Sequence, residues 1–168
     1  MQSQLFVGSN PQGIVVRVVG RGTMQESPAF RRLVEANRGC GPIIFDATEC
    51  EYLDSTFLGC LIGLQKTCEQ SSHTHFYVAA SRETRMKLFS LSSLNKYFDF
   101  LDPPLEALDE IVEVDIDKLD AITLGRHIMR CHSTLAEQGG DQAPAFRAIA
   151  DRLAQELGDD LPEENNNR

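Results

Sequence analysis

The stretch PIIFDATECEYLDSTFLGCLIGL, residues 42–64, decides the fold of this chain. It begins with a short apolar run that ends in Asp46, which is typical of a strand covered on both faces. A brief polar link follows, and a helical period starts after Asp54, with an apolar row that continues through Phe57 to Cys68. The pattern therefore predicts a buried strand, a short loop and a helix that packs closely against a sheet.

Ser55 falls in the first turn of this predicted helix, at the exposed carboxyl edge of the sheet. Backbone N–H groups are unpaired at a helix N-terminus, and the helix dipole favours negative charge there, so a phosphate on Ser55 would be well placed. The sequence puts no obvious base beside this serine, which is typical of an acceptor of chemistry rather than of a catalyst. Serine and aspartate are also ordinary helix caps; this is the alternative role for Ser55, and Asp54 is the expected cap.

Strands and helices alternate on both sides of this stretch, which predicts an α/β layer fold with a partly parallel sheet of four to five strands. Glycines at 59 and 63 lower the helix propensity of the central helix, and close backbone approach is one reason for a helix to carry them. Beyond residues 42–47, strands are predicted at 5–7, 13–19, 75–80 and 98–101, and helices around 30–34 and from 81 or 82 to 91.

The composition changes near residue 112, where we place the end of the first domain. Residues 117–138 and 145–157 are predicted to form two helices joined at Gly139-Gly140, so that residues 113–158 make a helical hairpin. The apolar face of this hairpin must be covered by the first domain or by a second copy of the chain. Residues 159–168 are acidic and then rich in asparagine, and we expect them to be disordered.

The net charge of −9 argues against a nucleic-acid-binding protein, because such a protein needs a basic face. No apolar run approaches the roughly 20 residues that span a bilayer, and no signal peptide is recognisable, so no membrane partner is expected. The five scattered cysteines form no CxxC pair, which predicts reduced thiols and a cytoplasmic location. His127 and Cys131 share a helix face without further ligands; we expect Cys131 in the core, and no metal or cofactor.

The segment IIFDAT followed by Asp54, Ser55, Thr56, Leu58 and Gly59 resembles the STAS domain, the family of bacterial anti-sigma-factor antagonists and stressosome-type modules. The later stretch TRMKLFSLSSLNKYFDF resembles the third helix, loop and final strand of that family, so the resemblance covers roughly residues 1–112. The hairpin lies outside it.

The resemblance implies a regulatory protein whose matching serine is phosphorylated by a kinase that is also the anti-sigma factor. Unmodified antagonist binds this partner, and phosphorylated antagonist releases it. The chain itself would then not be an enzyme, and ATP and Mg²⁺ would belong to the kinase. Carried to this sequence, Ser55 is the phosphoacceptor, Asp54 positions its hydroxyl, Asp46 shapes the loop 47–53, and Thr56 is a weaker second acceptor.

The turn departs from the family pattern at Phe57, where the family usually has glycine. We expect Phe57 to pack inward beside the apolar row of its helix; the alternative is contact with a partner, together with Leu58 and Gly59. Two other functions remain open for the chain: a scaffold that forms a homodimer through the C-terminal helices, with Ser55 only a cap, and a module that senses a small molecule. A hydrolase is least favoured, because no nucleophile–base pair is visible.

Overall fold

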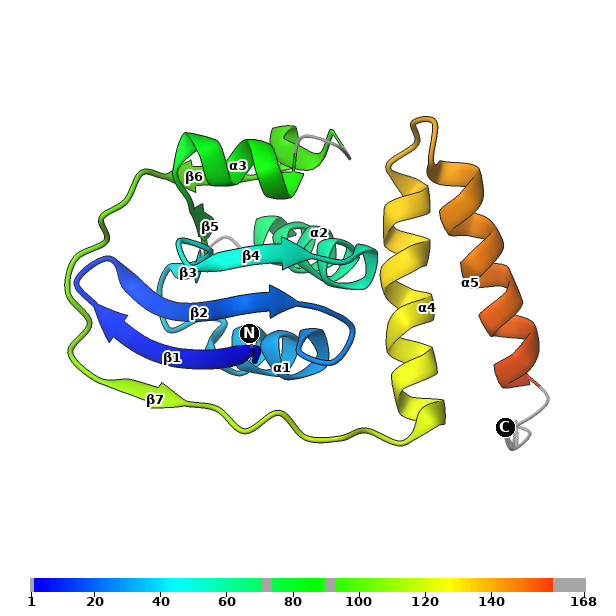
Figure 1. Cartoon of the computed structure of the whole chain (residues 1–168), viewed down its shortest axis with the longest axis horizontal. Coiled ribbons are helices and arrows are strands. Elements are labelled where there is room, and N and C mark those ends of the chain that lie inside the picture. The colour runs from blue at the N-terminus through cyan, green and yellow to red at the C-terminus, as the bar shows by residue number, and fades with distance from the viewer. Residues whose placement is uncertain (1, 71–73, 90–92, 159–168) are drawn as a thin grey trace.

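The structure is a computed structural model that describes residues 2–70, 74–89 and 93–158. Within these residues one sheet has the strand order β6-β5-β3-β2-β1-β7, and β4 pairs with the far end of β2 (Figure 1). The strands are β1 (Gln4–Asn10), β2 (Gly13–Gly22), β3 (Ile43–Asp46), β4 (Cys50–Leu53), β5 (Phe76–Ala79), β6 (Asp99–Leu101) and β7 (Ile111–Glu113). The helices are α1 (Ser27–Asn37), α2 (Ser55–Gln70), α3 (Arg82–Phe89), α4 (Ala121–Glu137), α5 (Ala143–Gly158) and the short 3₁₀ helix η2 (Leu94–Tyr97).

The sheet is mixed, as the sequence predicts. Strand β3 runs parallel to β2 and β5, and β6 runs parallel to β5, whereas β1 is antiparallel to both β2 and β7. The expected α/β fold with helices on a mixed sheet is therefore confirmed. The described sheet has seven strands rather than four to five, because β4 lies in the stretch expected to be a polar link and β7 follows the expected last strand. Both added strands are short, and the exposure of their residues shows no strict alternation, so the periodicity gives no sign of them.

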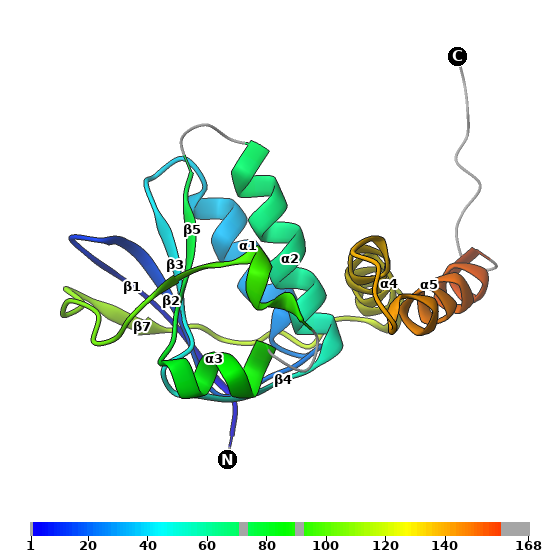
Figure 2. The same cartoon turned by 90° about the horizontal axis from the view of Figure 1, so that it is seen from above.

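Helices α1 and α2 cover one face of the sheet (Figure 2). Phe30 from α1, Phe45 from β3 and Phe57 from α2 meet at the centre of this layer, with ring centroids 5.0–5.8 Å apart, and all three side chains are fully buried. Phe57 thus packs inward, as expected. A second, smaller cluster of buried residues (Val15, Ile44 and Ala79) lies apart from this core, and Leu105 and Leu108 from the chain after β6 pack against it.

The hairpin forms a third layer, in which α4 crosses α2 and α5 packs on the outer side of α4 (Figures 1 and 2). The apolar face of α4 is therefore covered by the first domain of the same chain. Helix α4 begins at Ala121 rather than near residue 117, because Asp120 caps it by accepting a hydrogen bond from the Thr123 N–H at 2.8 Å. The tail at 159–168, expected to be disordered, lies outside the described residues. Across the described part of the chain, no helix is long and apolar enough to cross a membrane.

Candidate functional site

The N-terminus of α2 is capped and anchored by Asp54. One carboxylate oxygen, Oδ1, accepts a hydrogen bond from the Phe57 N–H at 2.8 Å, and the other, Oδ2, accepts one from the Met24 N–H at 2.8 Å. The first bond is the one that an N-cap side chain makes, so Asp54 has the expected capping geometry. The second bond ties the start of α2 to the loop after β2. The position of Ser55, the first residue of α2, is thereby fixed from two sides.

Ser55 has a histidine partner that comes from the hairpin. Its Oγ lies 3.0 Å from Nε2 of His132, and Nδ1 of His132 lies 2.9 Å from the carbonyl oxygen of Ile128. A carbonyl oxygen only accepts hydrogen bonds, so Nδ1 carries a proton, and in the neutral imidazole Nε2 is the nitrogen that accepts one from the serine hydroxyl. Sequence reasoning finds no base beside Ser55, because this one lies far along the chain and reaches the serine only through the docking of α4.

The surroundings of Ser55 correct the expectation of a hydroxyl at an exposed sheet edge. The side chain is half-buried and lines a cavity of about 330 Å³ between the domain and the hairpin. Leu135 and Phe146 from the hairpin and Leu58 from α2 are among the residues that line this cavity. The hairpin thus lies across the N-terminal end of α2, and Ser55 faces its side chains.

Gly59 allows the two helices to touch. A Cβ atom at residue 59 would lie only 2.3 Å from the carbonyl oxygen of Cys131 and 3.0 Å from its Cα, so any side chain there would overlap the backbone of α4. A Cβ at Gly63, one turn further along, would meet its nearest atom at 3.7 Å, which is an ordinary contact. Close backbone approach, expected from the glycines of this helix, therefore occurs at Gly59 and not at Gly63.

A buried polar cluster fills the junction of α1, α2 and α4. The Oγ atom of Ser27 lies 2.6 Å from Nε2 of His127, and the Sγ atom of Cys131 lies 3.6 Å from the same nitrogen. Arg31 Nη2 is 3.7 Å from Cys131 Sγ, and the Cys60 thiol lies 3.7 Å from the carbonyl oxygen of Ser27. Cys131 is fully buried, as expected. The described residues include no group of three or more histidine, cysteine or acidic side chains able to hold a metal ion.

Burial lowers the pKa of His127 to about 4, and the positive charges of Arg31 and Arg130 act in the same direction. Its imidazole is therefore neutral near pH 7 and can accept a hydrogen bond from a hydroxyl or thiol. This histidine belongs to the contact between hairpin and domain.

The other predicted site residues divide by location. Asp46 accepts bonds from Arg17 Nε at 2.7 Å and from the Thr48 N–H at 3.0 Å; it shapes the start of the loop 47–53, as expected, but has no recorded contact with Ser55. Thr56 is only 3 % exposed, so it is a poor second acceptor in this conformation. Of the three residues for which partner contact is the alternative role, Phe57 and Gly59 are buried and Leu58 is half-buried.

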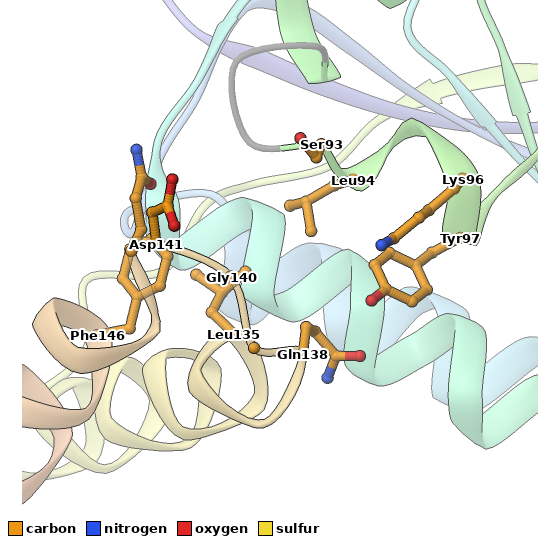
Figure 3. Close-up of a pocket in the computed structure, with 11 residues that line it drawn as sticks. Ser93, Leu94, Lys96, Tyr97, Leu135, Gln138, Gly140, Asp141 and Phe146 are labelled. Carbon is orange, nitrogen blue, oxygen red and sulfur yellow. The ribbon is translucent and has the colours of Figure 1, made fainter.

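The edge of the hairpin–domain contact is hollow. A cavity of about 220 Å³ lies between η2 and the turn that joins α4 to α5 (Figure 3). Leu94 and Tyr97 line it from the domain, and Leu135, Gln138 and Phe146 line it from the hairpin. The hairpin is therefore tightly packed at Gly59 and more loosely packed near its turn.

Comparison with known proteins gives a structural likeness only. No protein-family model matches the sequence, and no curated protein matches it either. Among solved structures, an anti-sigma factor antagonist from Mycobacterium paratuberculosis matches 62% of this chain and 89% of its own at 23% identity, with a TM-score of 0.52. The anti-sigma factor antagonist SpoIIAA in its unphosphorylated form matches 62% of this chain and 90% of its own, at 18% identity and a TM-score of 0.48. The expected STAS-like fold is confirmed.

Proposed function

We propose that this protein is a bacterial, cytoplasmic regulatory module that binds a signalling partner through the N-terminal end of α2. The partner is an anti-sigma factor, a serine kinase or a protein that is both, and it phosphorylates Ser55. The observation that carries the proposal is the Ser55 hydroxyl at the start of a helix capped by Asp54, on the fold shared with an anti-sigma factor antagonist. The chain needs no cofactor for this role and is not itself an enzyme.

Helix α2 suits a modified serine because the first-turn N–H groups and the helix dipole favour negative charge. Phosphorylation adds about −1.5 to −2 charge and three acceptor oxygens at Ser55. The fold tolerates this charge at the helix end, whereas a closely packed partner interface would have to bury it beside Asp54. Phosphorylation therefore weakens partner binding and leaves the domain folded.

The hairpin gives the module two states. In the state described here, Ser55 donates its hydrogen bond to His132, and Leu135 and Phe146 stand beside it. A kinase needs that hydroxyl free and in line with its phosphoryl donor, so α4 must move away from α2 before transfer. The bond between Ser55 and His132 stabilises the closed state, and His132 serves there as a hydrogen-bond acceptor, not as a catalytic base.

The test is phosphorylation of the purified full-length protein. Wild type, Ser55→Ala and Thr56→Ala are incubated with ATP, Mg²⁺ and fractionated extract of the source organism, and the products are mapped by peptide mass spectrometry. We expect one phosphate on Ser55 in wild type and in Thr56→Ala, and none in Ser55→Ala. Equal labelling of Ser55→Ala would show that the acceptor is another residue. Absence of labelling from wild type in every fraction would contradict the kinase part of the proposal.

A further inference from the structure

We propose that Cys60 of α2 and Cys131 of α4 are a redox-active thiol pair that closes into a disulfide and fastens the hairpin to the domain. Both thiols are present as free cysteines and both are fully buried. The proposed pairing rests on the close contact of α2 with α4 beside these two residues. Only its effect on signalling rests on the proposed function of Ser55.

The backbones of the two helices already meet at the required place. A Cβ at Gly59, the neighbour of Cys60, would lie 3.0 Å from the Cα of Cys131. A disulfide needs Cα atoms about 4.4–6.8 Å apart, which only segments in close contact provide. The two thiols also lie in the same buried cluster, because the Cys60 thiol is 3.7 Å from the carbonyl oxygen of Ser27 and Cys131 Sγ is 3.7 Å from Nη2 of Arg31, both residues of α1. The sequence separation of the pair means that the bond would join two layers of the molecule.

The side chains around the pair favour a thiolate. Burial raises the pKa of Cys60, but the hydrogen bond with the Cys131 thiol and the charge of the Arg31 guanidinium outweigh it, and the net shift is downward. The pKa of Cys131 is raised, first by its hydrogen bond with Cys60 and then by burial. Cys60 is therefore the first thiol to ionise. His127 Nε2 lies 3.6 Å from Cys131 Sγ, but with a pKa of about 4 it is too weak a base to take the thiol proton, so this proton must go to the group that leaves Cys60.

A peroxide supplies the oxidising equivalents. The Cys60 thiolate attacks one oxygen of hydrogen peroxide, the O–O bond breaks, and the products are a sulfenic acid on Cys60 and hydroxide, which takes up the released proton to form water. The sulfur of Cys131 then attacks the Cys60 sulfur, the S–O bond of the sulfenic acid breaks, and the Cys131 thiol proton passes to the departing hydroxyl. This group leaves as a second water. In sum, two thiols lose two electrons and two protons to one peroxide, and one disulfide and two waters form.

The other buried thiols lack these features and serve as internal controls. Cys50 donates to the carbonyl oxygen of Tyr52 at 3.5 Å, and burial raises its pKa to about 11. Burial also raises the pKa of Cys68. No second thiol is recorded as a partner of either among the described residues. Cys40 is exposed and reports the reactivity of an unhindered thiol.

The closed disulfide would hold α4 across the N-terminal end of α2. Ser55 would then stay beside His132, and a partner could not reach it. If the proposed function is correct, oxidation keeps Ser55 inaccessible to its partner, and reduction allows α4 to move away and expose it.

The test uses full-length protein that carries only the substitution Cys40→Ser, which prevents cross-links between molecules. The protein is treated with hydrogen peroxide, or equilibrated in glutathione redox buffer, without urea and at a urea concentration below the unfolding transition. Remaining thiols are alkylated after unfolding, and the peptides are mapped by mass spectrometry. We expect one linked peptide that joins Cys60 to Cys131, while Cys50 and Cys68 stay alkylated. The linked peptide should be absent from Cys60→Ser and Cys131→Ser proteins.

The proposal would be overturned if Cys60 and Cys131 stayed free under all of these conditions. The peroxide doses must be ones that fully oxidise Cys40 in the unsubstituted protein. Oxidation of the two thiols to separate sulfinic acids would overturn the proposal as well. Because no kinase enters this experiment, its result is independent of the phosphorylation of Ser55. Phosphorylation of oxidised protein at the same rate as reduced protein would overturn only the effect on signalling.

Discussion

A single methyl group at residue 59 should weaken the packing of the hairpin on the domain. Gly59→Ala places a Cβ against the backbone of Cys131, which cannot give way as a flexible side chain would. We expect a loss of about 1–3 kcal/mol in the free energy of unfolding, the usual cost of overpacking. Gly63→Ala is the matched control: it has room, and the better helix propensity of alanine should make it neutral or about 0.5–1 kcal/mol more stable.

Urea denaturation of the two glycine variants checks this prediction. Equal effects of Gly59→Ala and Gly63→Ala on stability would contradict the packing of α4 on Gly59.

His127 should make the hairpin contact sensitive to acid. Its pKa is about 4 in the folded protein, against an ordinary value of 6.5, so between these values the unfolded chain binds more protons than the folded one. Stability is therefore fully present above pH 6.5 and falls as the pH drops toward 4. The groups that face the imidazole, Arg31, Arg130, Ser27 and Cys131, supply no negative charge that would offset its protonation.

The measurement compares urea unfolding of wild type and His127→Gln at several pH values from 7 to 4. Wild type should lose more stability over this range than the variant, because glutamine does not titrate. Parallel curves would show that His127 does not control the acid sensitivity.

Sequence reasoning predicts the residues of the site that depend on local chemistry and misses those that depend on docking. Asp54 and Ser55 are recognisable because an N-cap and a first-turn serine are defined by their place in one helix. The contact with His132 arises only when two separate segments meet, and no local pattern carries that information. His127 and Cys131 do stand out as a pair on one helix face, but a metal is the only ligand that their spacing suggests, and the structure shows them against Ser27 and Arg31 instead.

At the scale of elements, the strongly periodic segments are predicted well and the short ones are not. The strands β2, β3 and β5 and the helix α2 fall where alternation, apolar runs and helical period place them. Strand β4 exists because β2 is long enough to pair with β3 along one part and with β4 further on, with a register shift between Gly20 and Arg21. Such pairing is decided by tertiary contacts, which the sequence of β4 does not display.

The hairpin should be the first part of the molecule to open. It contacts the domain mainly through α2, and the edge of that contact holds a cavity of about 220 Å³. Units with few buried contacts open at lower free energy than core strands. We therefore expect native-state hydrogen exchange to show weaker protection of amides in α4 and α5 than in β2 and β3, with the difference growing in low concentrations of urea. Equal protection in both units would mean that the chain opens as one body.

At the scale of the whole molecule, the docking of α4 on its own domain predicts a monomer. The homodimer expected through the C-terminal helices would need the apolar face of α4, and that face is already occupied by α2. Sedimentation of the full chain at micromolar concentration should give a single species with the mass of one chain. A concentration-dependent dimer would contradict this prediction. The variant Ile149→Glu then tests the exposed side of α5, where Ile149 is 43% exposed: a dimer that persists in this variant would have its interface on a different surface.

The segment 114–120, which connects β7 to α4, makes the hairpin a resident competitor for the face that it covers. So short a tether, at most about 24 Å when extended, keeps α4 at an effective concentration in the millimolar range beside α2. A partner that binds the same face must compete with this local concentration, and its apparent dissociation constant is the intrinsic one divided by the fraction of molecules that are open. Each change of about 1.4 kcal/mol in the free energy with which α4 docks on α2 should therefore shift the apparent affinity of a partner tenfold, even when no residue that contacts the partner is changed.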